Sequence, residues 1–199
     1  MNRFVVMISS AAAIMAVPAL ADQAKPMKHG SAMKHEMAKP GAPMAQGAMV
    51  HADVIGADGK SMGMVMLQDT PTGVLVKTDL KGLPAGEHGF HFHEKGMCDA
   101  AQKFTTAGAH FAAGKMQHGL MVAGGPHGGD MPNAFVGADG MLKAELLNTG
   151  VTLAAGPKSL ADADGSALVI HAKPDDYKTQ PSGDAGDRIA CAVVAAPKK

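Results

Sequence analysis

Two histidines separated by one residue, His91 and His93, are the side chains whose spacing is best suited to chemistry. They lie in the stretch Gly89 to Cys98, Gly-Phe-His-Phe-His-Glu-Lys-Gly-Met-Cys. On a β-strand, alternate side chains point to opposite faces, so both imidazoles would share one face. Neutral imidazole binds zinc, copper, iron or nickel. The pair alone also fits two surface histidines on a half-buried strand, so the interpretation depends on the rest of the chain.

Further donors follow in the segment from Lys95 to Pro132, which is dense in glycine and histidine, and in a later apolar run. They are His110, His118, His127, Asp130 and His171. With the first pair they make seven donors, whereas two closed four-coordinate sites need eight. An imidazole has two ring nitrogens, so one histidine shared between two ions would supply the missing donor. The alternative is a solvated loop that is simply rich in histidine.

The kinds of donor indicate which ions would fit. The run from His118 to Asp130 suits three nitrogens and one oxygen around zinc, in a closed tetrahedron of structural character. A set made only of histidines suits copper in an open, tetragonal geometry.

Short apolar or alternating runs separated by turn residues must position these donors. We predict strands over residues 50–55, 62–67, 74–80, 89–94, 134–136, 141–148, 167–172 and 189–194. Eight or so short strands without a long helix favour an all-β fold, an antiparallel sandwich or flattened barrel. Residues 95–132 are expected to form a long loop without regular structure, and such a loop inside a compact domain is usually functional.

The first 21 residues have the pattern of a secretory signal peptide. Arg3 precedes an apolar run from Phe4 to Val17, and Ala19-Leu20-Ala21 fits a cleavage site. The run is short for a membrane span, so an anchor or buried helix is the less favoured alternative. Export would place the chain in an oxidising compartment. Cys98 and Cys191 would then form a disulfide.

Residues 22–48 are expected to be a disordered extension, because they mix Ala, Pro, Gly, Lys and Met without an apolar period. Met27-Lys28-His29 recurs there as Met33-Lys34-His35. Thioether sulfur favours Cu(I), so the segment could collect copper. A plain flexible tether is the alternative.

Composition limits the partners. Acidic and basic residues number 18 each, and the chain has no Trp and one Tyr. This neutral balance does not support nucleic-acid binding, and no membrane contact is expected after signal cleavage. A homodimer is compatible with the sequence, but sandwich faces look alike whether they meet solvent or a partner, so the oligomeric state stays open.

From about Met49 to Ala195 the chain resembles the copper/zinc superoxide dismutase family, specifically its bacterial periplasmic branch. The motifs that carry the resemblance are Gly89-Phe90-His91-Phe92-His93, Gly108-Ala109-His110-Phe111, His118-Gly119, Pro126-His127-Gly128-Gly129-Asp130, Leu168-Val169-Ile170-His171 and Gly186-Asp187-Arg188-Ile189-Ala190-Cys191. The resemblance implies a domain over residues 49–199 with a Greek-key antiparallel β-sandwich, or flattened eight-stranded barrel, and long metal-binding loops.

The same resemblance implies one copper and one zinc per subunit. The implied copper ligands are His91, His93, His110 and His171, and the implied zinc ligands are His110, His118, His127 and Asp130. His110 would bridge the two ions.

Roles for three further features also follow from the resemblance. Asp175 would accept hydrogen bonds from the outer nitrogens of His91 and His118. Arg188 would present a cation beside the open copper position, although an ion pair with a neighbouring aspartate is an equal alternative. The bond between Cys98 and Cys191 would close a loop of about 90 residues and stabilise the fold by roughly 4 kcal/mol in the chain-entropy model.

Some positions depart from the family pattern. Ala112 and Ala113 follow Phe111 where Asn and Pro are usual, and Ala192 follows Cys191 where Gly is usual. These changes raise the prospect of looser packing near the bridge and lower activity. His51 and His88 match no ligand position and are interpreted as structural.

The resemblance implies an enzyme that converts superoxide to dioxygen and hydrogen peroxide and so protects the periplasm. His110 would take a proton and return it to the nascent peroxide. One alternative is a secreted copper-buffering protein on the same scaffold, which would need neither the zinc ligands nor Asp175 and Arg188. An adhesion-type sandwich is another, and it would need none of the seven ligands.

Overall fold

The computed structural model describes residues 47–198 of the chain. The predicted signal peptide, residues 1–21, and nearly all of the predicted extension, residues 22–48, lie outside this range. Between residues 47 and 198 no helix has the length and apolar character needed to cross a membrane.

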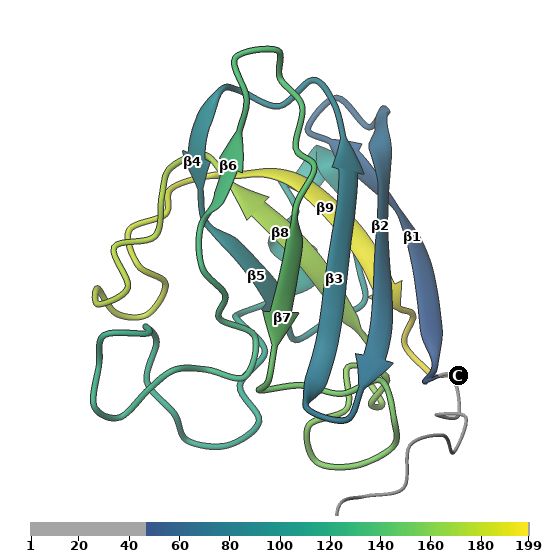
Figure 1. Cartoon of the computed structure of the whole chain (residues 1–199), viewed down its shortest axis with the longest axis vertical. Helices are drawn as coiled ribbons and strands as arrows, with labels where there is room; N and C mark the ends of the chain where they lie inside the picture. Colours follow the sequence, from purple (N-terminus) through teal and green to yellow (C-terminus); the bar gives the residue numbers. More distant parts are fainter. Residues whose placement is uncertain (1–46, 199) are drawn as a thin grey trace, which may run out of the picture. The chain divides into compact units, whose positions relative to one another are not determined.

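Nine strands and two short 3-10 helices make up the described part of the chain (Figure 1). The strands are β1 (Met49–Gly56), β2 (Ser61–Thr70), β3 (Gly73–Leu80), β4 (Gly86–His88), β5 (Phe90–His93), β6 (Ala134–Val136), β7 (Glu145–Asn148), β8 (Ser166–His171) and β9 (Arg188–Ala195), and the helices are η1 (Ala100–Gln102) and η2 (Thr105–Ala107). Seven strands form one antiparallel sheet in the order β5-β8-β9-β1-β2-β3-β7, and β4 pairs with β6.

The large sheet curls so that its two halves face each other. In Figure 1, β5, β8 and β9 run obliquely behind β7, β3 and β2. Inward side chains from both halves, such as Leu67 of β2, Phe92 of β5 and Leu168 of β8, belong to one buried core. Burial of this apolar surface is the main stabilising contribution to the fold. The predicted all-β, antiparallel flattened barrel is therefore confirmed.

Crossing connections bring distant parts of the sequence together. The chain passes from β3 to β4 and β5 at the far edge of the sheet, and β7 later returns to pair with β3. β9 lies beside β1, ahead of the β1-β2-β3 meander, which is the strand order of a Greek key. This topology puts β5 and β8 next to each other, although their sequences are about 75 residues apart.

The prediction missed β4 (Gly86–His88), and two further expectations were wrong. The predicted strand over 141–148 is shorter, because only residues 145–148 pair with β3 and Leu142 makes an isolated bridge to Leu80. Residues 95–132 are not without regular structure, since they contain η1 and η2. Phe104 and Ala107 from this segment are fully buried against β8 and β9, so the segment has a small core of its own.

The predicted disulfide between Cys98 and Cys191 is present, with Cα atoms 5.8 Å apart. It joins residues 95–132 to the last strand, and Cys191 belongs to the small core with Phe104. The bond therefore holds that segment against the outer side of β8 and β9.

Replacing both cysteines, Cys98→Ser with Cys191→Ser, should lower the free energy of unfolding by about 2–5 kcal/mol, because the unfolded chain loses a closure between residues 93 apart. Urea unfolding of the metal-free protein measures the effect. Wild type with a reductant is the control and should match the variant. Equal midpoints for the oxidised wild type and the variant would contradict the prediction.

Candidate metal centre

Strand β5 is buried on both faces, and this places His91 and His93. Phe90 and Phe92 point into the main core, while the two imidazoles point to the opposite face and have no exposed surface. The later loop covers that face because it is tied to the strand through its backbone. The Phe92 N–H donates to Gly129 O at 3.0 Å, and the Phe111 N–H donates to Phe92 O at 2.8 Å.

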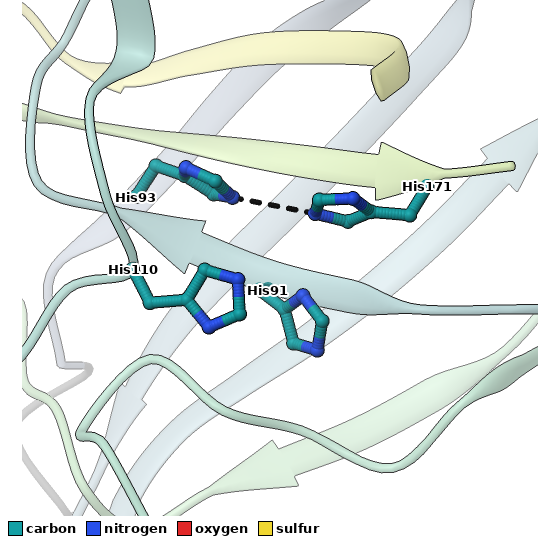
Figure 2. Close-up of side chains that lie close together, drawn as sticks. All are labelled: His91, His93, His110 and His171. Atoms are coloured by element: carbon teal, nitrogen blue, oxygen red, sulfur yellow. Dashed lines mark hydrogen bonds between the residues drawn. The ribbon is translucent and has the colours of Figure 1, made fainter. Parts of the chain in front are cut away.

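Four imidazoles converge in a first group, the four-histidine set, which consists of His91, His93, His110 and His171. One nitrogen from each ring lies within 4.8 Å of a nitrogen from every other ring. Figure 2 shows His93 on β5 and His171 on β8 pointing at each other, with Nε2 atoms 3.4 Å apart, and His110 approaching from the loop. The set therefore joins two neighbouring strands and the long loop.

A second group, the Asp130 set, gathers three imidazoles around one carboxylate oxygen. Asp130 Oδ1 lies 2.9 Å from His110 Nδ1, 3.1 Å from His118 Nδ1 and 3.6 Å from His127 Nδ1. The other carboxylate oxygen accepts the backbone N–H groups of Gly119 and His127, which fixes its orientation. Three nitrogens and one oxygen are a donor set typical of zinc.

His110 belongs to both sets because its two ring nitrogens face different groups. Nδ1 faces Asp130, whereas Nε2 is buried on the side of the four-histidine set. Among the described residues, His110 Nε2, His91 Nδ1 and His127 Nδ1 have no hydrogen-bond partner. Buried polar atoms are nearly always paired. These three nitrogens therefore fit as ligands of cations. His91 Nδ1 and His110 Nε2 belong to the four-histidine set, and His127 Nδ1 belongs to the Asp130 set.

The ligand rings are oriented by contacts on their outer nitrogens. His91 Nε2 lies 2.8 Å from Asp175 Oδ2, and His118 Nε2 lies 3.1 Å from Asp175 Oδ1. One buried carboxylate thus contacts a ring of each set, where the sequence predicted it. Gly183 packs directly on this carboxylate, since a Cβ at that position would overlap Asp175 Oδ1. Such contacts fix the ring orientation and raise the basicity of the ligating nitrogen.

Known proteins are similar to this chain in sequence and in fold. The family model for copper/zinc superoxide dismutase matches residues 61–194. The chain belongs to the copper/zinc superoxide dismutase family. A superoxide dismutase [Cu-Zn] of Caulobacter vibrioides is 49% identical over 146 residues, covering 72% of this chain and 83% of the relative. Family membership makes this chain a superoxide dismutase that uses copper and zinc.

Solved structures agree with the family assignment. A SOD-like protein from Bacillus subtilis has a TM-score of 0.71 at 34% identity, covering 74% of this chain and 99% of the other. The Cu/Zn superoxide dismutase from Brucella abortus has a TM-score of 0.61 at 27% identity, with the same coverage of the two chains.

Burial prepares three rings of the dismutase for metal binding. It lowers the pKa of His91 to about 4, against the opposing hydrogen bond to Asp175, and the pKa of His171 to about 3. Burial also holds the pKa of His93 well below its usual value. Without metal, these imidazoles are therefore neutral near pH 7, which is the form that binds a metal.

His118 differs because it lies between two carboxylates. Burial opposes its charge, but hydrogen bonds to Asp130 and Asp175 outweigh burial and raise its pKa to about 9. Burial also opposes the charges of the two carboxylates, yet bonds from the surrounding histidines hold both carboxyl pKa values well below their usual range. In the metal-free dismutase His118 is thus protonated on both nitrogens, and a metal at Nδ1 must displace a proton.

Arg188 lies directly across from His171 in the β8–β9 register. Its guanidinium donates to Phe104 O at 2.7 Å and to Gly108 O at 2.6 Å, and Gly108 O also contacts His93 Nδ1 at 3.0 Å. Among residues 47–198 it has no carboxylate partner within 4.0 Å, so the alternative of an ion pair with Asp184 or Asp187 was wrong.

The residues outside the predicted ligand groups behave in different ways. His88 is buried, with ring nitrogens 2.7 Å from His171 O and 2.9 Å from Pro84 O, which fits its structural interpretation. His51 is exposed on β1, so its structural interpretation stays a prediction. Ala192 packs within the main core at 1% exposure, while Ala112 lies at the surface.

Sequence reasoning missed two side chains that hold ligands through the backbone. Gln180 accepts the His118 N–H at 2.9 Å and donates to His118 O at 2.8 Å. Asn133 accepts the Asp175 N–H at 2.8 Å and donates to Asp175 O at 3.0 Å. A side-chain amide that hydrogen-bonds the backbone of a distant residue has no sequence motif of its own. The sequence therefore held no signal that could have identified Gln180 or Asn133.

Zinc uptake by the metal-free protein should release about one proton per ion near pH 7.5, because His118 carries a proton with a pKa of about 9 that zinc must displace. Titration calorimetry in buffers of different ionisation enthalpy counts the protons. A Gln180→Ala variant, which keeps all the carboxylates and histidines, is the control and should release the same number. Zinc binding with no proton released would contradict the protonated state of His118.

Proposed function

We propose that the four-histidine set binds copper, that the Asp130 set binds zinc, and that His110 bridges the two ions. The observation that carries this proposal is the His110 ring, whose Nδ1 faces Asp130 while Nε2 is buried without a partner beside the other histidines. The donor chemistry supports the same division, since four imidazoles suit copper and three nitrogens with one carboxylate suit zinc.

The reaction is the conversion of two superoxide ions and two protons to dioxygen and hydrogen peroxide. Copper in the four-histidine set would supply the one-electron exchange, and zinc would hold the bridging ring. His110 Nε2 takes up a proton and later gives it to the peroxide that forms, because its ring belongs to both donor sets and this nitrogen has no hydrogen-bond partner in the protein. Asp130, 2.9 Å from His110 Nδ1, holds the ring in place during that transfer, and zinc bound in the Asp130 set would add to this.

Arg188 attracts and docks the superoxide anion. Two carbonyl oxygens hold its guanidinium beside His93 and His171, and the side chain is only partly buried. An arginine has five N–H donors, so two carbonyl contacts leave others to meet an anion. A copper-buffering protein would need neither this cation nor a carboxylate shared between both sets, so these features support the enzyme.

We also propose that the protein works in the periplasm, where it would protect the cell envelope from superoxide. The signal-peptide pattern of residues 1–21 supports export, and the disulfide between Cys98 and Cys191 suits an oxidising compartment. The Met/His-rich residues 22–48 would collect copper there and raise its local concentration near the enzyme.

Removing the bridge should affect both metals, whereas removing an outer zinc ligand should affect one. His110→Ala should lower the copper and the zinc content of the purified protein, and His127→Ala should mainly lower zinc. Elemental analysis per chain measures both, with a superoxide-consumption assay on the same samples. Lys115→Ala, at an exposed position of the same long loop, serves as the control and should keep full metal content. An unchanged content of both metals in the His110 variant would exclude the shared ligand.

Charge reversal at Arg188 should slow the reaction without emptying the sites. Arg188→Glu should reduce the turnover of the metal-loaded enzyme on the order of tenfold or more at low salt, because steering of an anion is electrostatic. The difference should shrink as salt screens charges beyond about 10 Å at 0.1 M. Stopped-flow superoxide decay measures it.

Arg188→Lys is the matched control, since it keeps the positive charge and should retain much of the rate. Metal content must be measured for each variant. If the Glu variant, with copper and zinc in place, matched wild type at every ionic strength, Arg188 would have no part in attracting the substrate.

A further inference from the structure

The outward face of the β1-β2-β3 meander, at one side of Figure 1, carries an unusual group of donors. In the sheet register His51 of β1 lies directly opposite Met66 of β2, and Asp53 lies opposite Met64. Because alternate residues share a face, these four side chains form two adjacent rows on the side away from the core. We name His51, Met64 and Met66 the outer Met-His patch.

The three side chains of this patch are close enough to share a ligand. Directly opposed residues in an antiparallel pair have Cβ atoms about 4.5–5.5 Å apart, and diagonal neighbours lie within reach of long side chains. His51, Met64 and Met66 all line one open depression of about 550 Å³, together with Asp53 at its side. Met64 and His51 are exposed, and Met64 retains 45% of its surface.

The side chains here are not those expected on a solvated strand. Outward strand positions favour β-branched, aromatic or charged residues, yet two successive outward positions of β2 are methionines. The inward positions of the same strand, Val65 and Leu67, are fully buried, so the core does not need these sulfur atoms. Core packing therefore does not explain the methionines at positions 64 and 66, and binding of a ligand would.

The donor chemistry selects one class of ligand. Two thioether sulfurs and one imidazole nitrogen form a soft set, which suits Cu(I) and suits zinc or magnesium poorly. The charges nearby do not oppose a cation. Lys77 also lines the depression, but its ammonium lies 2.9 Å from Glu145 on β7, and Asp53 and Asp79 place carboxylates on the two sides of Met64.

We propose that His51, Met64 and Met66 form a surface site for Cu(I), separate from the two donor sets. In the sheet, β9 lies between β1, which carries His51, and β8, which carries His171, and the site shares no residue with either donor set. Its histidine, His51, lies three residues after the end of the Met/His-rich segment, residues 22–48. A copper ion held here would keep the metal at the enzyme without filling the active site. The inference does not depend on the ligand roles proposed for His110.

The test uses the full chain loaded with copper and zinc and labelled with ¹³C at the methionine methyl groups. Its bound copper is first reduced to Cu(I). Cu(I) is added without oxygen as its acetonitrile complex. We expect saturable shifts of the Met64 and Met66 methyl signals and of the His51 ring signals as Cu(I) is added, and the methionines of residues 22–48 are followed separately because that segment would also bind copper. Reduced copper is diamagnetic, so the signals stay sharp, and the filled active site takes no further ion.

Met64→Leu with Met66→Leu keeps the side-chain volume and should lower the Cu(I) affinity read at His51 by at least about tenfold. Met121→Leu, another highly exposed methionine, is the matched control and should change nothing. The proposal is overturned if added Cu(I) shifts other methionines and leaves Met64 and Met66 unmoved. It is also overturned if Zn²⁺ occupies the site as tightly as Cu(I), because a soft set would not allow that.

Discussion

Six imidazoles and one carboxylate are buried in two groups, the four-histidine set and the Asp130 set. The rest of this structure depends on that constraint. Five of those imidazoles and Asp130 are at most 6% exposed, and three of the ring nitrogens have no protein partner. Unpaired buried polar groups cost about 1–3 kcal/mol each, so cations that complete the arrangement would stabilise the fold. Metal binding and folding are therefore linked in this chain, and the protein around the donors has to keep them in place before a metal arrives.

Three devices keep the donors in place, and each acts through the backbone or through a buried carboxylate. Pairing of β5 with β8 sets the distance between His93 and His171. Backbone hydrogen bonds to Phe92 and the disulfide hold the long loop against the sheet. Asp175 links a ring of one set to a ring of the other, so a disturbance in either set reaches its neighbour. Rigid elements thus supply the precision that a loop alone would lack.

Much of this could be predicted from the sequence, since strand alternation and ligand spacing are local properties. The spacing of His91 and His93 predicted the face they share, and the donor count indicated that two four-coordinate sites would have to share one ligand. The assignment of particular ligands and of Asp175 came from family resemblance. Other features could not be predicted. The small core around Phe104 packs residues that are far apart in the sequence. The hydrogen bonds of Arg188, Gln180 and Asn133 go to backbone carbonyls, which every residue has.

The period of two that makes the core also makes the surfaces that bind metal. On β5 the alternation sends phenylalanines inward and histidines to the covered face, and on β2 it sends Val65 and Leu67 inward and two methionines to the open face. A shift of one residue in either strand would exchange these faces and put polar or soft donors into the core. The hydrophobic core therefore fixes the register, and the register in turn fixes which side chains can meet a metal ion.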